Sequence, residues 1–289
     1  MYKVIAIIVT YNPEPEQFHL TLTSILNQVS LCIIVDNGNK KFDIDCSEKI
    51  RLITLGKNYG IAYAQNRGIE LAKQYNVDFI LLSDQDTIYH DGYVNKMLLF
   101  YEQYHNKSII GSLVPWVFDK NKMCKTKIAI KKFNCIVPEN DKVYRVAHAI
   151  SSGTFIPVRN LEKIGGMCEE LFIDWVDFEW CWRATNMGYE IICVPSVSIH
   201  HMMGDKSRKI GKRIIALRNR DRYYYMIRNA VYIIMHCSVL KIQEKLFFGI
   251  DLFTKVVGIC LIEKNAFLLL FKAIYDGVTK RMYKIETKE

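Results

Sequence analysis

The chain has 289 residues, of which 50% are hydrophobic and 24% are charged. A chain of this length and composition can bury a large core. It therefore excludes an intrinsically disordered protein and suits one large α/β domain, with or without an appendage. The nine cysteines are spread singly, without a C-x-x-C pair. This spacing argues against a zinc site or a disulfide framework and indicates free thiols in a reducing cytoplasm.

The charge is unevenly distributed along the chain. Residues 1–205 contain 21 Lys and Arg against 23 Asp and Glu, whereas residues 206–289 contain 18 against 7. The whole net charge of +9 therefore comes from the last part of the chain. A basic segment of this kind suggests an anionic partner, such as a phosphate group, a nucleic acid or the inner membrane leaflet.

Strand and helix patterns alternate in the first hundred residues. Short apolar runs rich in β-branched residues predict buried strands at residues 3–11, 31–38, 50–56 and 77–84. The first of these runs straight into a turn and lacks the basic start and cleavage site of a signal peptide. Apolar residues at helical spacing predict helices at 15–28, 60–75 and 90–104. Such repeated units predict a mostly parallel sheet, with helices on both faces and ligands beyond the carboxyl ends of the strands.

The pattern is less regular in the second half of the chain. Strands are expected at residues 108–118, 142–150 and 152–158, a helix at 174–188, and two short strands around Pro195 within 189–201. Long aromatic and basic helices follow residue 205. None of their apolar runs reaches the ~20 residues that a membrane-spanning helix needs. These helices are expected either to lie on a membrane surface, or to pack on the catalytic domain or form a dimer.

Two aspartates follow the fourth predicted strand at alternate positions. Asp84 and Asp86 point the same way in an extended chain, so their carboxylates repel each other unless a cation lies between them. Mg²⁺ and Mn²⁺ prefer carboxylate oxygens and keep substrate phosphates as further ligands. The pair therefore indicates a metal ion that arrives with a diphosphate. The alternative interpretation is a polar strand end followed by a turn.

A second cluster of acids lies among aromatic residues. Asp174, Asp177 and Glu179 stand beside tryptophans 175, 180 and 182. Acids in the first turn of a helix are favoured by the helix dipole alone. Aromatic residues between acids also indicate a cleft that stacks against a ring, in which one carboxylate acts as a general base.

Two further stretches contain candidate ligand residues. His200 and His201 end a predicted strand, where they are either metal ligands or core residues. Gly60 opens a predicted helix, whose first amides are expected to be open to a phosphate. The chain contains no G-x-G-x-x-G fingerprint, P-loop, G-x-S-x-G turn or H-E-x-x-H motif, so hydrolase and zinc-protease functions lack support.

Taken together, these stretches resemble glycosyltransferase family two, the inverting, metal-dependent sugar transferases of the GT-A fold. The matching segments occur in the order of the family and cover about residues 3–230: VTYNP at 9–13, VDNG at 35–38, NYGIAYAQNRGI at 58–69, SDQDT at 83–87, SSGT at 151–154, FIDWVDFEWCWR at 172–183 and HMMGD at 201–205. The D-Q-D form, the helix after Gly60 and the VDFEWCWR block are most similar to the rhamnosyltransferase branch, which builds bacterial surface polysaccharides.

The resemblance implies a role for each matching residue. The nucleotide sugar would contact Thr10, Tyr11, Asn12, Asp36, Asn58, Gly60, Asn66, Arg67, Asp84 and Gln85. Asp86 and His201 would bind Mg²⁺ or Mn²⁺, while His200 would point to the other side of its strand. Asp177 matches the catalytic base. Glu179, Trp175 and Trp180 would contact the acceptor.

The resemblance also implies a fold and an activity. We expect an α/β protein of the GT-A type, with a Rossmann-like, mixed and mostly parallel sheet. Residues 1–205 would form the catalytic domain, with a nucleotide-sugar half at about 1–107 and an acceptor half at about 108–205. Residues 206–289 would form a basic helical extension.

The expected donor is dTDP-L-rhamnose, with UDP-galactofuranose or a UDP-hexose as alternatives. The expected acceptor is a saccharide, free or linked to undecaprenyl diphosphate, in O-antigen or capsule synthesis. The location would be the cytoplasm or the inner face of the cell membrane. A nucleic-acid-binding protein is disfavoured, because the basic residues alternate with long aliphatic runs and no nucleic-acid-binding motif occurs.

Overall fold

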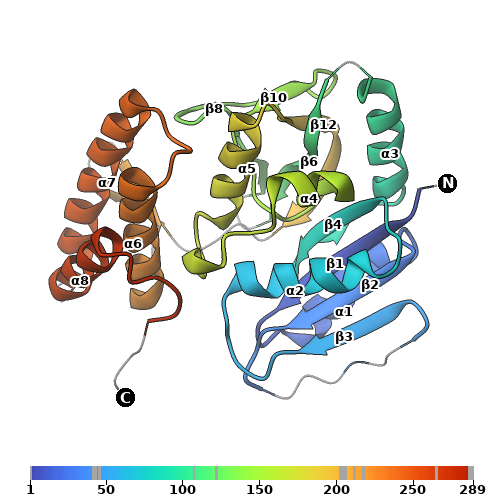
Figure 1. Ribbon diagram of the computed structural model, residues 1–289, viewed down its shortest axis with the longest axis horizontal. Helices are drawn as coiled ribbons and strands as arrows, with labels where there is room; N and C mark the ends of the chain where they lie inside the picture. The colour runs from blue at the N-terminus through green and yellow to red at the C-terminus, as the bar shows by residue number, and fades with distance from the viewer. Residues whose placement is uncertain are drawn as a thin grey trace.

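The computed structural model describes residues 2–40, 44, 47–106, 108–120, 123–201, 207–210, 213–216, 219–263 and 266–285. Residues 202–205 of the HMMGD segment lie outside this part. The chain forms one large sheet with helices on both faces, and a group of three helices stands beside it (Figure 1).

The large sheet has ten strands in the order β10-β12-β6-β11-β4-β1-β2-β3, with β5 beside β12 and β7 beside β6. Their bounds are β1 Val4–Thr10, β2 Leu31–Asp36, β3 Ile50–Thr54, β4 Phe79–Asp84, β5 Ile88–Tyr89, β6 Ile110–Asp119, β7 Cys124–Lys125, β10 Tyr144–Val146, β11 Phe155–Pro157 and β12 Glu190–His201. The longest pairings, among β1 to β4 and between β6 and β12, are parallel, whereas β11 runs antiparallel between β4 and β6. The predicted mixed, mostly parallel sheet is thus confirmed.

The helices and two small hairpins complete the described structure. Their bounds are α1 Pro15–Leu26, α2 Ile61–Lys73, α3 Tyr93–Tyr104, α4 Val158–Ile164, a 3₁₀ turn Glu169–Leu171, α5 Val176–Asn186, α6 Arg220–His236, α7 Ile242–Ile262 and α8 Ala266–Val278, with β8 Ile128–Lys131 paired to β9 Asn134–Ile136 and β13 Ser207–Ile210 paired to β14 Arg213–Ala216.

The strand period of two divides the core between the two faces of the sheet. In β1, Ile5 and Ile7 pack with α2, α4 and α5, whereas Ala6 and Ile8 pack with α1 and α3. Both faces of the central strands are covered, because successive side chains point to opposite sides. This explains why these strands are continuous apolar runs in the sequence.

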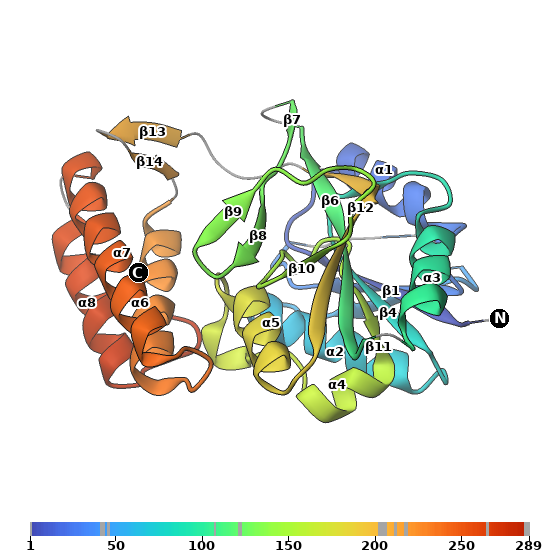
Figure 2. The ribbon, with the colours of Figure 1, turned by 90° about the horizontal axis from the view of Figure 1, so that it is seen from above.

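Helices α6, α7 and α8 lie together at one side of the sheet (Figure 2). A third apolar cluster joins them to the sheet domain, because Phe172 packs with Tyr223 and Tyr225 of α6. The division of the chain at residue 205 stays a prediction. Among the described helices, none combines the length and the hydropathy needed to cross a bilayer. The described cysteines are all free, as predicted.

Two local expectations were wrong. Residues 190–201 form a single strand, β12, instead of two, because the pairing with β6 shifts register between Val194 and Ser198 and continues past Pro195. Helix α5 begins at Val176 instead of residue 174, because Asp174 and Trp175 adopt positive φ angles of 62° and 67°. Asp174 and Asp177 therefore do not share one helix.

Candidate active site

The carboxyl ends of β1, β2 and β4 bring the first candidate residues together. Thr10 is paired with Asp36 across β1 and β2. The Thr10 hydroxyl donates to Asp36 Oδ1 at 3.1 Å, and the Gly38 N–H donates to the same oxygen at 3.1 Å. The second oxygen, Oδ2, is buried and has no hydrogen-bond partner among the described residues. A buried carboxylate oxygen without a donor is suited to receive an N–H or O–H of a ligand.

The loop after β1 is tied to the loop after β4. The Tyr11 N–H donates to Gln85 Oε1 at 2.7 Å, and the Thr21 hydroxyl donates to the Gln85 carbonyl at 2.9 Å. The Tyr11 ring stays 49% exposed and is therefore available to a planar ligand. Asn12 has a φ of 45° and accepts a hydrogen bond from the Lys40 N–H. The loops after β1 and β4 are thus joined beyond the carboxyl ends of the strands, and the nucleotide contacts of these residues stay a prediction.

Three side chains form a candidate metal site at the same edge. Ligand atoms of Asp84, Asp86 and His201 all lie within 4.8 Å of one another. Asp86 Oδ1 is 3.1 Å from His201 Nδ1, and Asp84 Oδ2 is 3.8 Å from His201 Nε2. Two ligands of an octahedral ion at about 2.1 Å are about 3 Å apart when adjacent and about 4 Å apart when opposite. One oxygen of each carboxylate and a single ring nitrogen of His201 are therefore close enough together to hold one divalent cation.

The electrostatics of these three residues favour a bound cation. Burial raises the pKa of Asp84, although the neighbouring His201 and a hydrogen bond from the Ser152 hydroxyl lower it. Burial lowers the pKa of His201, but the hydrogen bond with Asp86 and the charge of Asp84 raise it overall. The buried Thr87 hydroxyl, 3.2 Å from His201 Nδ1, orients the ring. Burial makes the negative charge of these carboxylates unfavourable, and a bound cation would compensate for it.

His200 faces the opposite side of β12. Its ring stacks on Phe118 at 4.9 Å and meets His90 edge-on at 4.8 Å. Successive residues of a strand point to opposite faces, so only one of the two histidines can reach the aspartates. The structure places His201 there, as expected.

Asp177 is half-buried in the first turn of α5. Burial raises the pKa of its carboxyl to about 7, the charge of Asp84 adds to the rise, and hydrogen bonds with Ser151 oppose it. Because Ser152 donates to Asp84, consecutive serines connect the candidate base with the metal site. A carboxylate with a pKa near neutrality accepts a proton well at physiological pH. The SSGT motif contains both serines but gave no hint of their partners.

A cavity of about 220 Å³ lies beside this helix. Its wall is mostly apolar and includes Phe178, His148 and Ser152. The rings of His148 and Phe178 are 3.8 Å apart, and burial and the charge of Lys132 lower the pKa of His148 to about 4. His148 is therefore a neutral part of an aromatic wall next to Asp177.

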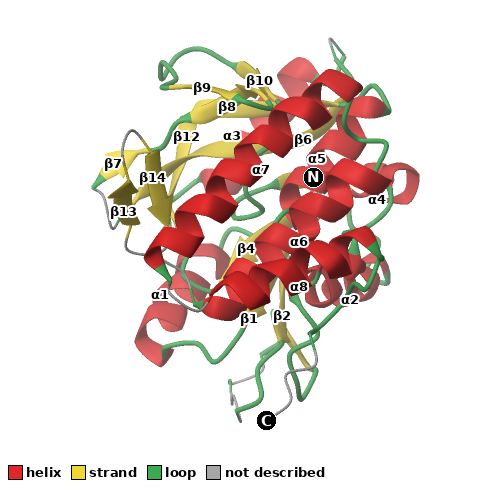
Figure 3. Cartoon of the chain, turned by 90° about the vertical axis from the view of Figure 1, so that its left-hand side faces the viewer, coloured by secondary structure: helices red, strands yellow, loops and turns green. Residues whose placement is uncertain are grey.

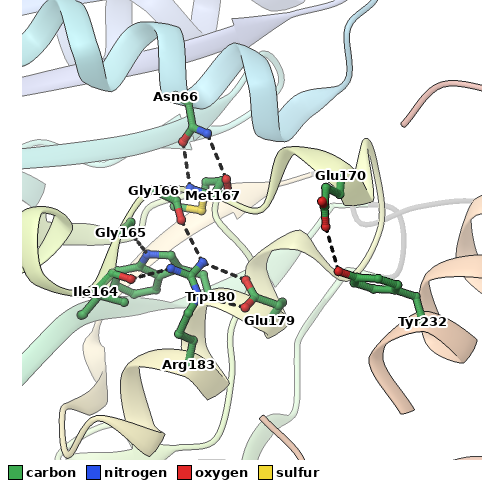
Figure 4. Close-up of polar contacts among 10 residues, drawn as sticks. All are labelled: Asn66, Ile164, Gly165, Gly166, Met167, Glu170, Glu179, Trp180, Arg183 and Tyr232. Carbon is green, nitrogen blue, oxygen red and sulfur yellow. Dashed lines mark hydrogen bonds and ion pairs between the residues drawn. The ribbon is translucent and has the colours of Figure 1, made fainter. Parts of the chain in front are cut away.

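Glu179 and Trp180 both bind other parts of the protein, and their expected contact with the acceptor stays a prediction. Glu179 forms two hydrogen bonds of 2.8 Å with Arg183, whose guanidinium also donates to the carbonyls of Ile164 and Gly166 (Figure 4). Trp180 is 2% exposed and donates from Nε1 to Gly165 O at 2.9 Å (Figure 4). Both residues hold the 164–166 turn against α5.

The first two amides at the start of α2 are already bonded within the protein, and the contact of Gly60 with the nucleotide sugar stays a prediction. Gly60 adopts a φ of 94°, and the Ile61 N–H donates to the Phe172 carbonyl at 2.8 Å. A Cβ at position 60 would lie 2.5 Å from that carbonyl oxygen, so glycine is required for the close approach. Asn58 accepts from the Gly60 N–H at 2.9 Å and from the Asn37 side chain at 3.0 Å, which shapes the turn.

Asn66 and Arg67 also contact other parts of the protein. The Asn66 amide donates to Met167 O at 2.9 Å, and its Oδ1 accepts from the Met167 N–H at 2.8 Å (Figure 4). The same amide also donates to Glu169 Oε1 at 2.8 Å. Arg67 pairs with Glu70 at 2.7 Å and with Glu169 at 3.4 Å. Both side chains thus contact residues 167–169, and their expected contacts with the nucleotide sugar stay a prediction.

Trp175 contacts the helical extension, and its expected place at the acceptor stays a prediction. Its Nε1 donates to Met226 O at 2.9 Å, and its ring meets Phe248 edge-on at 4.8 Å. The preceding Asp174 pairs with Arg222 at 2.8 Å. The sequence signal was ambiguous because a tryptophan packs equally well against a helix or a sugar.

Two residues of α6 hold the turn that leads into α5. The Asn229 amide donates to the carbonyls of Leu171, Ile173 and Asp174, at 2.8, 2.7 and 3.0 Å. The fully buried Arg228 donates to Leu171 O at 3.0 Å and to Asn229 Oδ1 at 2.8 Å. No sequence pattern indicates these contacts, because the partners are more than fifty residues apart.

This turn is strained. Phe172, Asp174 and Trp175 have φ angles of 64°, 62° and 67°, which non-glycine residues rarely adopt. Such a conformation costs about 1–3 kcal/mol per residue and persists where surrounding contacts enforce it. Helix α6 supplies those contacts immediately before Asp177.

Comparison with known proteins agrees with this geometry. The family model described as Glycosyl transferase family 2 matches residues 5–162. The dTDP-rhamnosyl transferase RfbF of Shigella flexneri is 34% identical over 256 residues, which is 85% of each chain. The crystal structure of S. aureus TarS 1–349 in complex with UDP-GlcNAc is similar with a TM-score of 0.58 and 15% identity, over 96% of this chain and 81% of that one. A structure of GalNAc-T7 with UDP, GalNAc and Mn²⁺ is similar with a TM-score of 0.56 and 12% identity, over 87% of this chain and 54% of the other. At these identities, the solved structures support the fold alone.

Proposed function

Because the chain belongs to glycosyl transferase family 2, we propose that it transfers L-rhamnose from dTDP-L-rhamnose to an acceptor hydroxyl, with inversion at the anomeric carbon. The acceptor is a saccharide, free or lipid-linked, of a bacterial surface polysaccharide such as O-antigen or capsule. The observation that carries the proposal is Asp177, with a pKa near 7, next to the Asp84–Asp86–His201 site. The 34% identity to a dTDP-rhamnosyl transferase favours rhamnose over galactofuranose or a hexose.

The nucleotide lies across the ends of β1 and β2. The unpartnered Asp36 Oδ2 accepts a hydrogen bond from the base or the ribose, while Thr10 and Gly38 hold the other oxygen in place. The exposed Tyr11 ring stacks on the base. Donor specificity for dTDP rests on this part of the site.

The diphosphate lies over the ends of β4 and β12. Asp86 and His201, with Asp84 beside them, would hold Mg²⁺ or Mn²⁺, an ion that spreads the charge developing on the departing diphosphate. Ser152 and Thr87 keep Asp84 and His201 in the arrangement that this ion requires. The side-chain carbonyl of Gln85 accepts from the Tyr11 N–H, and its main-chain carbonyl accepts from the Thr21 hydroxyl. Gln85 thereby points away from the aspartates on either side of it, whose carboxylates face the donor.

Asp177 accepts the proton of the acceptor hydroxyl during the displacement. A bond forms between the acceptor oxygen and the anomeric carbon on one face of the sugar. The bond to the diphosphate oxygen breaks on the opposite face, and dTDP leaves with the electron pair. Because attack and departure occur on opposite faces in one step, the configuration inverts without a covalent enzyme intermediate. The aromatic wall of Phe178 and His148 would bind the apolar face of the acceptor ring.

The test is a transfer assay with the purified full chain. The protein is incubated with dTDP-L-rhamnose, UDP-galactofuranose or UDP-glucose and a set of saccharide acceptors, and the product anomer is assigned by NMR. We expect transfer from dTDP-L-rhamnose, loss of transfer with chelator, and its return with Mg²⁺ or Mn²⁺. Efficient transfer from a UDP-sugar alone would contradict the donor assignment, and undiminished transfer in excess chelator would contradict the metal role.

A further inference from the structure

The outer surface of α7 and α8 is unusually apolar. Thirteen large apolar residues of these two helices are exposed by 36% or more: Ile242, Leu246, Phe247, Ile250, Phe253, Val257, Leu261, Phe267, Leu268, Phe271, Ile274, Tyr275 and Val278. Figure 3 shows α7 and α8 in front of the sheet, on the side of the molecule that faces away from α3. We refer to these thirteen residues as the outer face. Contiguous apolar surface of this extent is rare on a monomer and marks an interaction site.

The outer face is separate from the surface that α7 and α8 already bury. Phe248 and Ile259 of α7, and Leu270 and Ala273 of α8, point inward and are almost fully buried. Each helix therefore has one apolar side for the protein and a second apolar side that is exposed, although the Phe247 ring of that side also contacts Phe133 at 4.5 Å. Internal packing does not explain the second side.

The outer face of α7 follows the helical period. At 100° per residue, six of its exposed apolar positions, from Ile242 to Leu261, fall within an arc of about 100°. The charged residues of the helix lie on the opposite side, where Lys255 pairs with Asp251 at 2.7 Å and Glu244 pairs with Lys132 at 2.8 Å. This segregation is typical of a helix that lies in a membrane interface.

Basic residues border the outer face. Lys241 and Lys245 flank its beginning on α7, and Lys280 follows the end of α8, whereas Lys272 of α8 is paired with Asp276 at 2.6 Å. The segment to which they belong contains 18 Lys and Arg against 7 Asp and Glu. If a second copy of the protein packed its outer face on this one, the basic residues around the two faces would repel each other. A surface of anionic lipids would attract it.

We propose that the outer face docks on an anionic lipid bilayer. The aromatic and aliphatic side chains enter the boundary between headgroups and acyl chains, and the lysines contact anionic headgroups. α7 and α8 would then lie parallel to the membrane plane, with the sheet on the side of the cytoplasm. The proposal concerns binding alone and does not depend on the proposed transfer reaction.

The test is sedimentation of the full chain with vesicles. Vesicles of phosphatidylglycerol and phosphatidylcholine are compared with vesicles of phosphatidylcholine alone, at low and at high salt. The parent protein should bind the anionic vesicles more tightly, and added salt should weaken the difference. The double variant Ile250→Asp/Phe253→Asp should bind at least about a hundredfold more weakly, since each buried side chain contributes about tenfold or more.

The matched control is Leu99→Asp on α3. Leu99 is also exposed, by 57%, but lies on the other side of the molecule (Figure 2). This control should bind like the parent, and circular dichroism should show all three proteins folded. Equal binding of the parent and the double variant would overturn the proposal. Failure of the parent protein to bind vesicles would also overturn it, whatever its oligomeric state. If light scattering then shows that the parent is a dimer and that the double variant is a monomer, the outer face is a dimer interface instead.

Discussion

The side-chain amide of Asn229 lies 2.7 Å from the carbonyl oxygen of Ile173, and this contact joins α6 to the turn that precedes the candidate base. The same amide also donates to the carbonyls of Leu171 and Asp174. The helical extension thereby takes part in the geometry of the site, because the strained turn sets where α5 begins. An extension that served only as a tail would not need these contacts.

We expect Asn229→Ala to lower kcat at least about tenfold, with little change in the KM of the donor. Loss of the amide leaves buried carbonyls without donors, at about 1–3 kcal/mol for a buried polar group, and the turn relaxes. The control is Asn186→Ala, which removes a single exposed hydrogen bond of 3.3 Å from α5 to Ser238. Steady-state kinetics well below the melting temperature separate positioning from unfolding. Equal kcat values for the parent and Asn229→Ala would exclude the positioning role.

The protonation of Asp177 should make kcat/KM decrease on the acid side of the pH profile, which we call the acid limb. Only the carboxylate form accepts a proton, and its pKa is about 7, so kcat/KM should fall as the pH decreases below about 7. A bound cation near Asp84 would move this limb to lower pH, because it reduces the negative charge that helps to raise the pKa of Asp177. Asp177→Asn should lose about 10²–10⁴-fold in rate and also lose the limb. If the variant keeps both the rate and the pH dependence, the base is another group.

The same pKa predicts a pH dependence of stability. A carboxyl whose pKa is raised on folding contributes stability that is present below its unfolded pKa of about 3.9 and is lost as the pH rises through the folded value. For Asp177, the loss should occur between about pH 4 and about pH 7. In chelator, Asp177→Asn should therefore gain melting temperature relative to the parent as the pH rises from 5 to ~8. A constant difference between the two proteins over this range would show that the carboxyl titrates normally.

The two adjacent histidines provide a matched pair of variants for the metal site. His201→Ala and Asp86→Ala should abolish the rise in melting temperature that Mn²⁺ gives in the presence of dTDP, because each removes a ligand atom. His200→Ala should keep most of it, since its ring lies between Phe118 and His90 on the other side of the strand. A full Mn²⁺ response in His201→Ala, or its loss in His200→Ala, would reverse the assignment.

Glu179 should contribute to the stability of the folded protein. It is buried and pairs with Arg183 through two hydrogen bonds, so Glu179→Gln leaves a guanidinium without its carboxylate. Breaking such a pair costs about 3–5 kcal/mol in the free energy of unfolding. Glu70→Gln, which removes the exposed partner of Arg67, should cost about 1 kcal/mol or less. Urea unfolding measures both. A normal stability of Glu179→Gln with a raised acceptor KM would support its expected place at the acceptor.

Much of the fold and of the metal site follows from short-range features of the sequence. The strand period placed β1, β2 and β4, and the end of β4 placed Asp84 and Asp86 at the sheet edge where Asp36 and Thr10 also lie. The resemblance singled out His201 for the metal, and the alternation of side chains along β12 explains why His200 faces the other side. These predictions succeed because a strand has a period of two, and because parallel strands bring their carboxyl ends to one edge.

Tertiary structure alone decided the partners of the residues around that edge. Trp180 and Asn66 have the composition of a binding site, yet each donates to the backbone of a separate segment, whereas Glu179 pairs with Arg183 one turn further along its own helix. Asn229 has no local signal at all and acts on a turn more than fifty residues earlier. A polar side chain fits a ligand or a buried carbonyl equally well. Which of the two it meets depends on how distant segments pack, and local sequence does not contain that information.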